Sequence, residues 1–203
     1  MPNAVFFNIY KLKKGSSVPD FLIAVEQLVT QYASKQKGAM SFMLFNDCDT
    51  WADMGVFETM EDAKRFENPT GTNEYAERFY SFLNFSSCKS RMYTVKNSHQ
   101  LQAAPPKAVM FITFRLAKGA SESDFLLAAD KVDKEFMSLQ KGYGSWTQLT
   151  NGKEWADLLT WESLEDAQNA MMAGSASPVA HEFFAFLDNG SVEARFFTVE
   201  RSF

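Results

Sequence analysis

Two aspartates, each two residues after a tryptophan, are the side chains in this sequence with the clearest capacity for chemistry. The pairs are Trp51 with Asp53 and Trp155 with Asp157. Residues two apart share one face of a strand. A carboxyl beside an aromatic ring on a partly buried face has a raised pKa and is suited to accept a proton. Asp53 and Asp157 are therefore candidate catalytic bases, and Trp51 and Trp155 are candidate substrate-binding residues.

A structural explanation competes with this catalytic one. The same pair occurs in both halves of the chain, and a duplicated protein needs its scaffold twice but its reactive groups only once. In that case each aspartate pairs with an arginine or with backbone donors, and each tryptophan fills a core. Arg91 and Arg195, which are also duplicated, are the first partners expected.

Positions where the two halves differ are better candidates for a single pocket. They are Asn8 against Ile112, Tyr10 against Phe114, Trp146 against Phe42, and His181 against Glu77. Asn8, Tyr10 and Trp146 are candidate substrate-binding residues. His181, on a predicted amphipathic helix, is a candidate proton shuttle, although a lone histidine there is more often a surface or capping residue.

The chain contains two copies of one unit, displaced by 104 positions without a gap. Trp-Ala-Asp at 51–53 recurs at 155–157, and Glu-Asp-Ala at 61–63 recurs at 165–167. We expect a first repeat over residues 1–96, a polar, proline-stiffened linker over 97–107, and a second repeat over 108–203.

Local patterns predict the same element order in each repeat. In the first repeat we expect strands at 4–12, 40–46, 51–58 and 87–96, and helices after Ser17, over 60–67 and over 73–83. Ser17 is placed to begin its helix as a cap, and Gly38 to end it in a left-handed conformation. The turn at 68–71 interrupts the later helical region. The order β-α-β-β-α-β is that of ferredoxin-like folds, so the fold class is α+β.

In such a unit both helices lie on one face of the sheet, which leaves the opposite apolar face uncovered. The sister repeat, tethered by a short linker, is the nearest available cover. We therefore expect the repeats to pack sheet to sheet as an intramolecular pseudo-dimer, with a further homo-oligomer left open.

These features resemble the dimeric α+β barrel superfamily, whose members include antibiotic biosynthesis monooxygenase-like domains and stress-responsive barrel proteins. The resemblance rests on the element order, Lys14-Gly15 after the first strand, and the motifs at 51–53 and 61–63 with their copies. It implies a pseudo-dimeric α+β barrel. One such fold hosts many chemistries, including cofactor-free oxygenation, haem degradation and isomerisation.

The pattern of the haem-degrading branch is incomplete in both copies. That pattern has an asparagine on the first strand, then a tryptophan and a histidine on the second helix. Asn8 is present in the first copy, where Glu77 stands at the histidine position. His181 is present in the second copy, where Ile112 replaces the asparagine and Met171 the tryptophan. Haem degradation is therefore disfavoured.

Composition and the absence of motifs exclude several classes. A net charge of −5 argues against a nucleic-acid partner. There is no apolar run long enough to cross a membrane and no secretory leader pattern, so we expect a cytoplasmic protein. Cys48 and Cys88 lie outside the repeated framework, and no clustered histidines and cysteines or phosphate loop occur. No metal or cofactor is expected.

Two functions remain open. The first is a cofactor-independent, monooxygenase-like enzyme acting on a small apolar or aromatic compound, which the abundant aromatic residues and methionines would surround. The second is a non-catalytic module that binds a hydrophobic ligand or serves in stress-related assembly. A pocket with an unpaired acid or histidine inside favours the first; a filled interior with paired acids favours the second.

Overall fold

The computed structural model describes residues 4–67, 73–101 and 105–203. The chain divides into two compact units, Met1–Thr94 with Glu200–Phe203, and Val95–Val199. The predicted turn at 68–71 lies outside the described residues. Among the described helices, none is long and apolar enough to cross a membrane.

The elements follow the predicted order in both halves. The first half contains β1 (Ala4–Leu12), α1 (Val18–Gln31), β2 (Ala39–Asp47), β3 (Thr50–Phe57), α2 (Met60–Glu67), α3 (Glu74–Phe82) and β4 (Leu83–Gln100). The second contains β5 (Ala108–Phe114), α4 (Glu122–Glu135), β6 (Tyr143–Thr150), β7 (Trp155–Trp161), α5 (Leu164–Gly174), α6 (Pro178–Phe184) and β8 (Glu193–Ser202). Ser17 accepts a hydrogen bond from the Asp20 backbone and caps α1, as predicted.

The strands are hydrogen-bonded in the order β1-β3-β2-β8-β5-β7-β6-β4, a closed antiparallel barrel, which confirms the α+β barrel class. β4 extends to Gln100, so the first four residues of the predicted linker are strand. Residues 95–100 belong to the second unit and Glu200–Phe203 to the first. Phe203 exchanges two backbone hydrogen bonds with Phe42 of β2, at 2.9 and 3.2 Å. Each unit therefore receives a strand segment from the other half of the chain.

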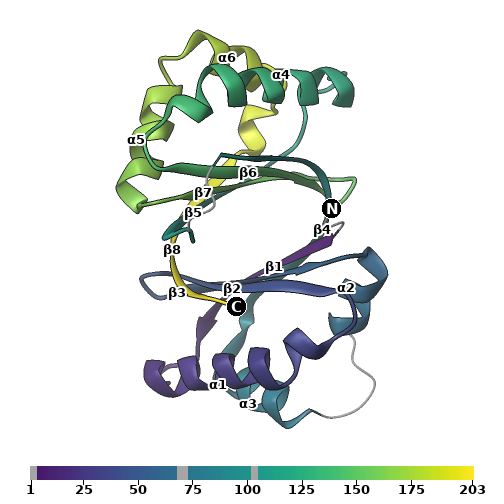
Figure 1. Ribbon diagram of the computed structural model, residues 1–203, viewed down its shortest axis with the longest axis vertical. Coiled ribbons are helices and arrows are strands. Elements are labelled where there is room, and N and C mark those ends of the chain that lie inside the picture. Colours follow the sequence, from purple (N-terminus) through teal and green to yellow (C-terminus); the bar gives the residue numbers. More distant parts are fainter. Residues whose placement is uncertain (1–3, 68–72, 102–104) are drawn as a thin grey trace. The chain divides into compact units, whose positions relative to one another are not determined.

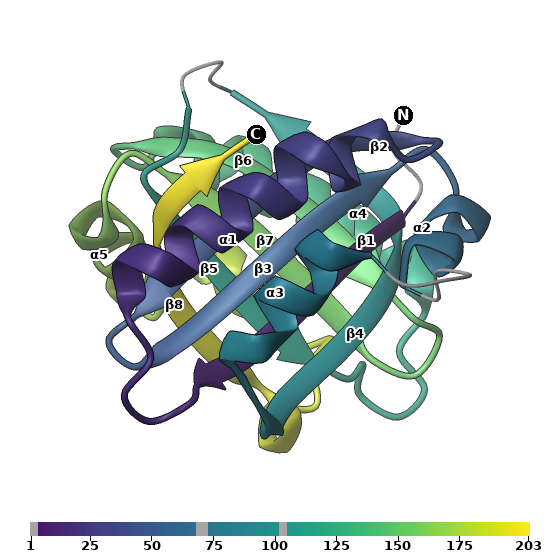
Figure 2. The same ribbon diagram turned by 90° about the horizontal axis from the view of Figure 1, so that it is seen from below.

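Helices cover one face of the sheet in each unit (Figure 1). In the first unit, α1 and α3 lie side by side across that face (Figure 2). The helix-facing positions of β1 are Phe6, Asn8 and Tyr10, and Phe6 and Tyr10 are buried in the aromatic core. The second unit has an equivalent core between its sheet and α4, α5 and α6. Any functional group on the helix-facing side of a strand is thus held in apolar surroundings.

Two glycines each lie against an aspartate in the first turn of a helix. Gly38, before β2, lies against Asp62, and Gly142, before β6, lies against Asp166. Gly38 and Gly142 have φ values of +72° and +73°, the left-handed conformation predicted for Gly38. A Cβ atom on Gly142 would lie 2.7 Å from Oδ2 of Asp166. Asp166 is buried and also accepts a hydrogen bond from Ser163, the cap of α5. The turn therefore tolerates no side chain.

We expect Gly142→Ala to lower the free energy of unfolding by about 2 kcal/mol or more, because it adds a clash to the strain of positive φ. Gly119 is the matched control, since its φ is +86° but no atom lies within 4 Å of the point that a Cβ would occupy. Gly119→Ala should cost only about 1 kcal/mol. Urea unfolding of both variants measures the difference, and equal losses would contradict this explanation.

Candidate functional site

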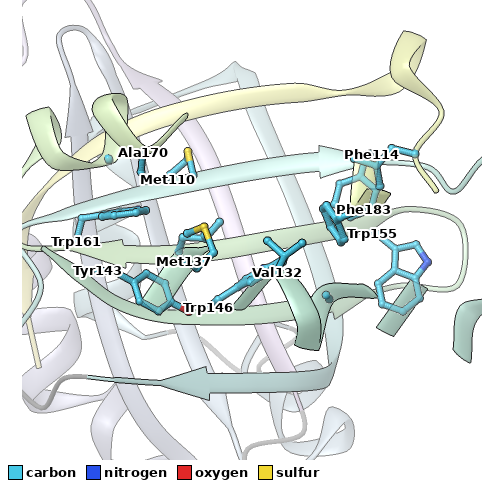
Figure 3. Packing of buried hydrophobic residues seen from close by; sticks show 14 of the residues in the cluster. Met110, Phe114, Val132, Met137, Tyr143, Trp146, Trp155, Trp161, Ala170 and Phe183 are labelled. Atoms are coloured by element: carbon cyan, nitrogen blue, oxygen red, sulfur yellow. The ribbon is translucent and has the colours of Figure 1, made fainter. Parts of the chain in front are cut away.

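A cavity of about 280 Å³ lies between the sheet and the helices of the second unit. This is close to the lower end of the range for small-molecule sites, about 300 Å³. Its walls are almost entirely apolar, and they are formed by Met110, Ile112, Val132, Phe136, Met137, Trp146, Asp157, Leu159, Ala170, Met171, Gly174, Ala180, Phe183, Phe184, Leu187, Asn189 and Val192. Figure 3 shows part of the surrounding core, with Trp161 and Tyr143 at one end and Phe114, Trp155 and Phe183 at the other.

Asp157 provides the one carboxyl group among the described residues of the cavity wall. It lies on β7 between Ile112 of β5 and Gln148 of β6, its direct cross-strand neighbours. Its side chain is only 3% exposed, and Oδ1 has no hydrogen-bond partner in the described part of the chain. Burial raises its pKa from 3.8 to about 7. The N–H groups of Trp146 and Gln148 lie close enough to the carboxyl to oppose part of this rise, although neither forms a hydrogen bond of normal geometry with it. Near neutral pH this group can therefore either hold or accept a proton.

Asp53, the equivalent residue of the first unit, has a partner. Nδ2 of Asn8 donates a hydrogen bond to its Oδ1 at 2.8 Å. Burial raises the pKa of Asp53 to about 6, with Asn8 opposing the rise. Burial and the nearby Asp53 also raise the pKa of Tyr10 well above its ordinary value. The structure thus brings the candidates Asn8, Tyr10 and Asp53 together, but beside a space of only about 80 Å³.

The expected arginine partners lie on the other face of each sheet. Arg91 is opposite Phe7 in the strand register, and Arg195 is opposite Phe111. Asp53 and Asp157 pair one position further along, with Asn8 and Ile112. Because side chains of a strand alternate between faces, neither arginine points toward the carboxyl. The prediction that arginines pair with these acids was wrong.

The tryptophans divide into two groups. Trp51 packs edge-on against Phe21 with ring centroids 4.9 Å apart, and Trp155 packs in the same way against Phe125 at 4.8 Å. Neither belongs to the described lining of the two cavities, so both fill cores. Trp146 does line the larger cavity, is 2% exposed, and has an indole Nε1 without a partner among the described residues.

His181 does not reach the cavity. It is exposed, and its Nε2 donates a hydrogen bond to the backbone carbonyl oxygen of Ser175 at 2.7 Å. It is absent from the described lining, although its neighbours Ala180 and Phe183 are present. The role that this geometry supports is fixing the segment between α5 and α6, as expected for a lone histidine on a helix.

One side chain contributes clearly to the difference in cavity size between the units. Phe66 of α2 stands where the second copy has Ala170 of α5. The Phe66 ring lies 5.5 Å from Phe6, 5.6 Å from Phe42 and 5.4 Å from Phe57, and so occupies the first interior. Replacing a phenylalanine by alanine at this position leaves the corresponding space in the second unit open.

Sequence reasoning missed Gln148. It is fully buried on β6, directly across from Asp157, and neither polar atom of its side chain has a hydrogen-bond partner in the described chain. The first copy has Leu44 at this position. A comparison of the copies for polar residues gained on a buried face would have found it.

Comparisons with known proteins identify the fold. No protein-family model and no curated protein matches the chain. A Fusobacterium nucleatum protein provisionally described as a monooxygenase aligns over 99% of this chain and 94% of its own, with TM-score 0.71 and 9% identity. An anthrone oxidase-like protein aligns over 100% and 93%, with TM-score 0.62 and 13% identity. A Listeria monocytogenes ferredoxin-fold protein related to antibiotic biosynthesis monooxygenases aligns over 99% and 96%, with TM-score 0.56 and 12% identity. The predicted resemblance is confirmed for the fold.

Among the described residues of the cavity wall, methionine is the one side-chain type known as a haem ligand. A haem-binding protein from Thermus thermophilus shares the fold, with 9% identity, TM-score 0.60, and alignment over 98% of this chain and 91% of its own. The described cavity lining here contains no histidine, cysteine or tyrosine, and His181 is bound to Ser175 instead. Across the described residues, no group of three or more His, Cys, Asp or Glu side chains could hold a metal ion.

The raised pKa of Asp157 predicts a pH-dependent stability. Between about pH 4 and pH 7 the folded protein retains a proton that the unfolded chain has released. The free energy of unfolding therefore falls as pH rises through this window, by up to about 1.4 kcal/mol per pH unit, and levels off above it. Asp157→Asn should remove this contribution.

Urea unfolding of wild type and Asp157→Asn at several pH values measures the effect. The difference in unfolding free energy, wild type minus variant, should decline from pH 4 to pH 7 and then remain constant. Because other titrating groups contribute equally to both proteins, the comparison isolates Asp157. A difference that does not change with pH would show that this carboxyl titrates normally.

Proposed function

We propose that the protein binds a small, largely apolar aromatic compound in the cavity of the second unit, and that Asp157 accepts a proton from it. The observation that supports this proposal is a carboxyl group, almost fully buried and unpartnered at Oδ1 within the described chain, in the wall of a largely apolar cavity. Buried polar groups in folded proteins normally have partners. A bound ligand would supply the missing one.

The pKa of about 7 suits this role. A general base works best when its pKa lies near the working pH, since it is then partly ionised and still a useful proton acceptor. The cavity opens beside the exposed apolar side chains of Met171, Phe184 and Val192, which also line it. These would admit an apolar molecule from solvent.

The reaction that we propose is oxidation by dioxygen without a cofactor. The substrate would be an aromatic ketone with an acidic CH2 group, a class suggested by the anthrone oxidase-like neighbour. Asp157 removes one proton, and the resulting carbanion transfers an electron to dioxygen. Recombination forms a peroxide anion, which takes the proton back from Asp157 and becomes a hydroperoxide. The hydroperoxide then loses water to leave a second carbonyl group. The CH2 carbon is oxidised and dioxygen is reduced, one atom ending in the product and one in water.

The alternative is a non-catalytic module that binds a hydrophobic ligand or serves in assembly. The first unit favours it, because there Asn8 satisfies the equivalent carboxyl and aromatic rings fill most of the interior. The same arrangement of strands and helices can thus exist without a reactive group. In this alternative Asp157 would bind the ligand as a hydrogen-bonding group without removing a proton.

We also propose how many working cavities the protein has and where it is located in the cell. We infer that the chain has one working cavity, that of the second unit. Cys48 and Cys88 are exposed free thiols, which suits the reducing conditions of the cytoplasm.

Oxygen consumption with anthrone tests the catalytic proposal. Wild type should consume one dioxygen per anthrone and form anthraquinone, and Asp157→Asn should slow this by about 100-fold or more. Asp53→Asn should retain the wild-type rate. Binding of anthrone without consumption of dioxygen would favour the non-catalytic alternative, and equal rates for wild type and Asp157→Asn would exclude Asp157 as the base.

Closing the cavity tests the location of the site. Ala170→Phe introduces the ring that fills the first unit and should abolish anthrone binding, measured by calorimetry on protein shown to be folded by circular dichroism. Met172→Phe is the matched control, since Met172 lies on the same helix but is 64% exposed and outside the described lining. Unchanged binding by Ala170→Phe would place the ligand elsewhere.

A further inference from the structure

A second polar cluster lies in the second unit, where the end of β4 lies against α4. It consists of Asn97 and His99 of β4, Asp130 and Asp133 of α4, and Tyr143 of β6. The side chains of His99 and Asp133 are only 16% and 14% exposed, and Tyr143 is buried. None of the five belongs to the described lining of the cavity. The cluster is therefore distinct from the groups of the proposed site.

The histidine ring of this cluster is held at both nitrogens. Nδ1 of His99 lies 3.4 Å from Oδ2 of Asp133. Nε2 lies 3.2 Å from Oδ1 of Asp130 and 3.0 Å from Nδ2 of Asn97. An ionised carboxyl group only accepts hydrogen bonds, so we assign a proton to Nδ1. Nε2 can accept from Asn97 when the ring is neutral and donate to Asp130 when it is charged, so the ring has partners in both states.

The carboxylates that hold the ring are themselves fixed. The Tyr143 hydroxyl donates a hydrogen bond to Oδ1 of Asp133 at 2.6 Å, and Nδ2 of Asn97 donates one to Oδ1 of Asp130 at 2.8 Å. Burial and the contact with Asp133 raise the pKa of Tyr143, so its hydroxyl keeps the proton that it donates. A connected network of this kind holds His99 in one orientation between α4 and the sheet.

Trp146 is the cavity residue that His99 contacts. The backbone N–H of Leu101 donates a hydrogen bond to the carbonyl oxygen of Gly144 at 2.9 Å. In the antiparallel pairing of β4 with β6, this bond places His99 opposite Trp146. Their ring centroids are 6.1 Å apart, with 46° between the ring planes. Trp146 lines the cavity and lies diagonally across from Asp157 in the β6–β7 register, within reach of a large side chain.

The first unit has an apolar version of the same corner. Phe203 of β8 stands at the position of His99, and Val29 of α1 at that of Asp133. Both line the small first cavity. Apolar side chains of suitable volume often stabilise a protein as well as a buried charged network does. The polar version in the second unit therefore adds a fixed orientation that stability alone does not require.

We propose that His99 is a positioning residue, which holds the Trp146 ring in the orientation that keeps its N–H close to the Asp157 carboxyl. That N–H opposes part of the rise in the pKa of Asp157. If the Trp146 ring turns away, the carboxylate loses a donor and holds its proton more tightly. The effect on Asp157 needs no ligand; only its consequence for catalysis rests on the function proposed above.

Carbon-13 NMR titration of the Asp157 carboxyl group tests this inference in the free protein. His99→Phe keeps an aromatic ring and removes both nitrogens, and circular dichroism checks that the variant is folded. The Asp157 midpoint should rise by about 0.5 to 1 pH unit, because the carboxylate loses a donor. Lys131→Met is the matched control, since it removes the ion pair between α4 and Glu182 without touching the network, and it should leave the midpoint unchanged.

Trp146→Phe separates positioning from a direct effect of charge. His99→Phe should shift the Asp157 midpoint when Trp146 is present and should have no effect in the Trp146→Phe background. An equal shift in both backgrounds would show that the charge of His99 acts on Asp157 through space, and would overturn the proposal. An unchanged midpoint in His99→Phe with Trp146 present would overturn it as well.

Asp133→Asn gives a second test, which also covers the case that His99→Phe does not fold. It keeps every ring and removes only the charge that faces Nδ1 of His99. Loss of a nearby negative charge would by itself lower the Asp157 midpoint. The proposal predicts a rise, because the ring of His99 is released and no longer holds Trp146. A fall in the midpoint would contradict it.

The pH profile of anthrone oxidation measures the consequence for the proposed reaction. The rate should follow the ionised fraction of Asp157, so His99→Phe should be about two- to fivefold slower than wild type at pH 7 and equal to it above about pH 9. A loss of rate that persists at high pH would show damage to the site and contradict a positioning role. If wild type does not oxidise anthrone, the proposed function fails, and the NMR titrations still decide the role of His99.

Discussion

A carboxyl group buried on the helix-facing side of each sheet is the constraint on which the site depends. Asp157 is almost fully buried and Asp53 is half-buried, so each carboxyl is stabilised by being paired, by remaining protonated, or by contact with a bound ligand. The first unit pairs its carboxyl with Asn8. The second unit leaves Oδ1 of Asp157 without a partner in the described chain and keeps a space beside it. The same fold therefore contains one carboxyl group with a side-chain hydrogen-bond partner, Asp53, and one whose Oδ1 has no partner in the described chain, Asp157.

The two repeats differ at most positions around this carboxyl, and three of these differences bear directly on the site. Phe66 fills the first interior, whereas Ala170 leaves the second open. Leu44 and Phe42 of β2 become Gln148 and Trp146 of β6, which adds two N–H donors. In the proposed function, the larger space would hold the ligand beside Asp157.

Much of the fold was predictable because it depends on local patterns. The strand at Ala4–Leu12, the cap at Ser17 and the left-handed Gly38 follow from alternation and turn chemistry over a few residues. The length of β4 was underestimated because residues 97–100 are polar, and backbone pairing with β6 rather than apolar alternation makes them a strand. The residue pattern around positions 97–100 does not indicate that this segment pairs with β6.

The site was only partly predictable for the same reason. Asp157 and Trp146 were identified from type, spacing and divergence between copies, and both line the cavity. Trp51 and Trp155 proved to be core residues, and His181 points to a backbone carbonyl. Arg91 and Arg195 lie on the opposite face of the sheet from the acids because of the strand register. That register could not be predicted from the sequence. The existence of the cavity depends on how side chains from distant segments fill a shared volume.

The most direct test of this account is a carbon-13 NMR titration of the Asp157 carboxyl group, assigned by its disappearance in Asp157→Asn. The structure predicts a pKa of about 7 for this group in the free protein. A value near 4, the ordinary value for a solvated aspartate, would show that the carboxyl is not held in an apolar environment and would contradict the account.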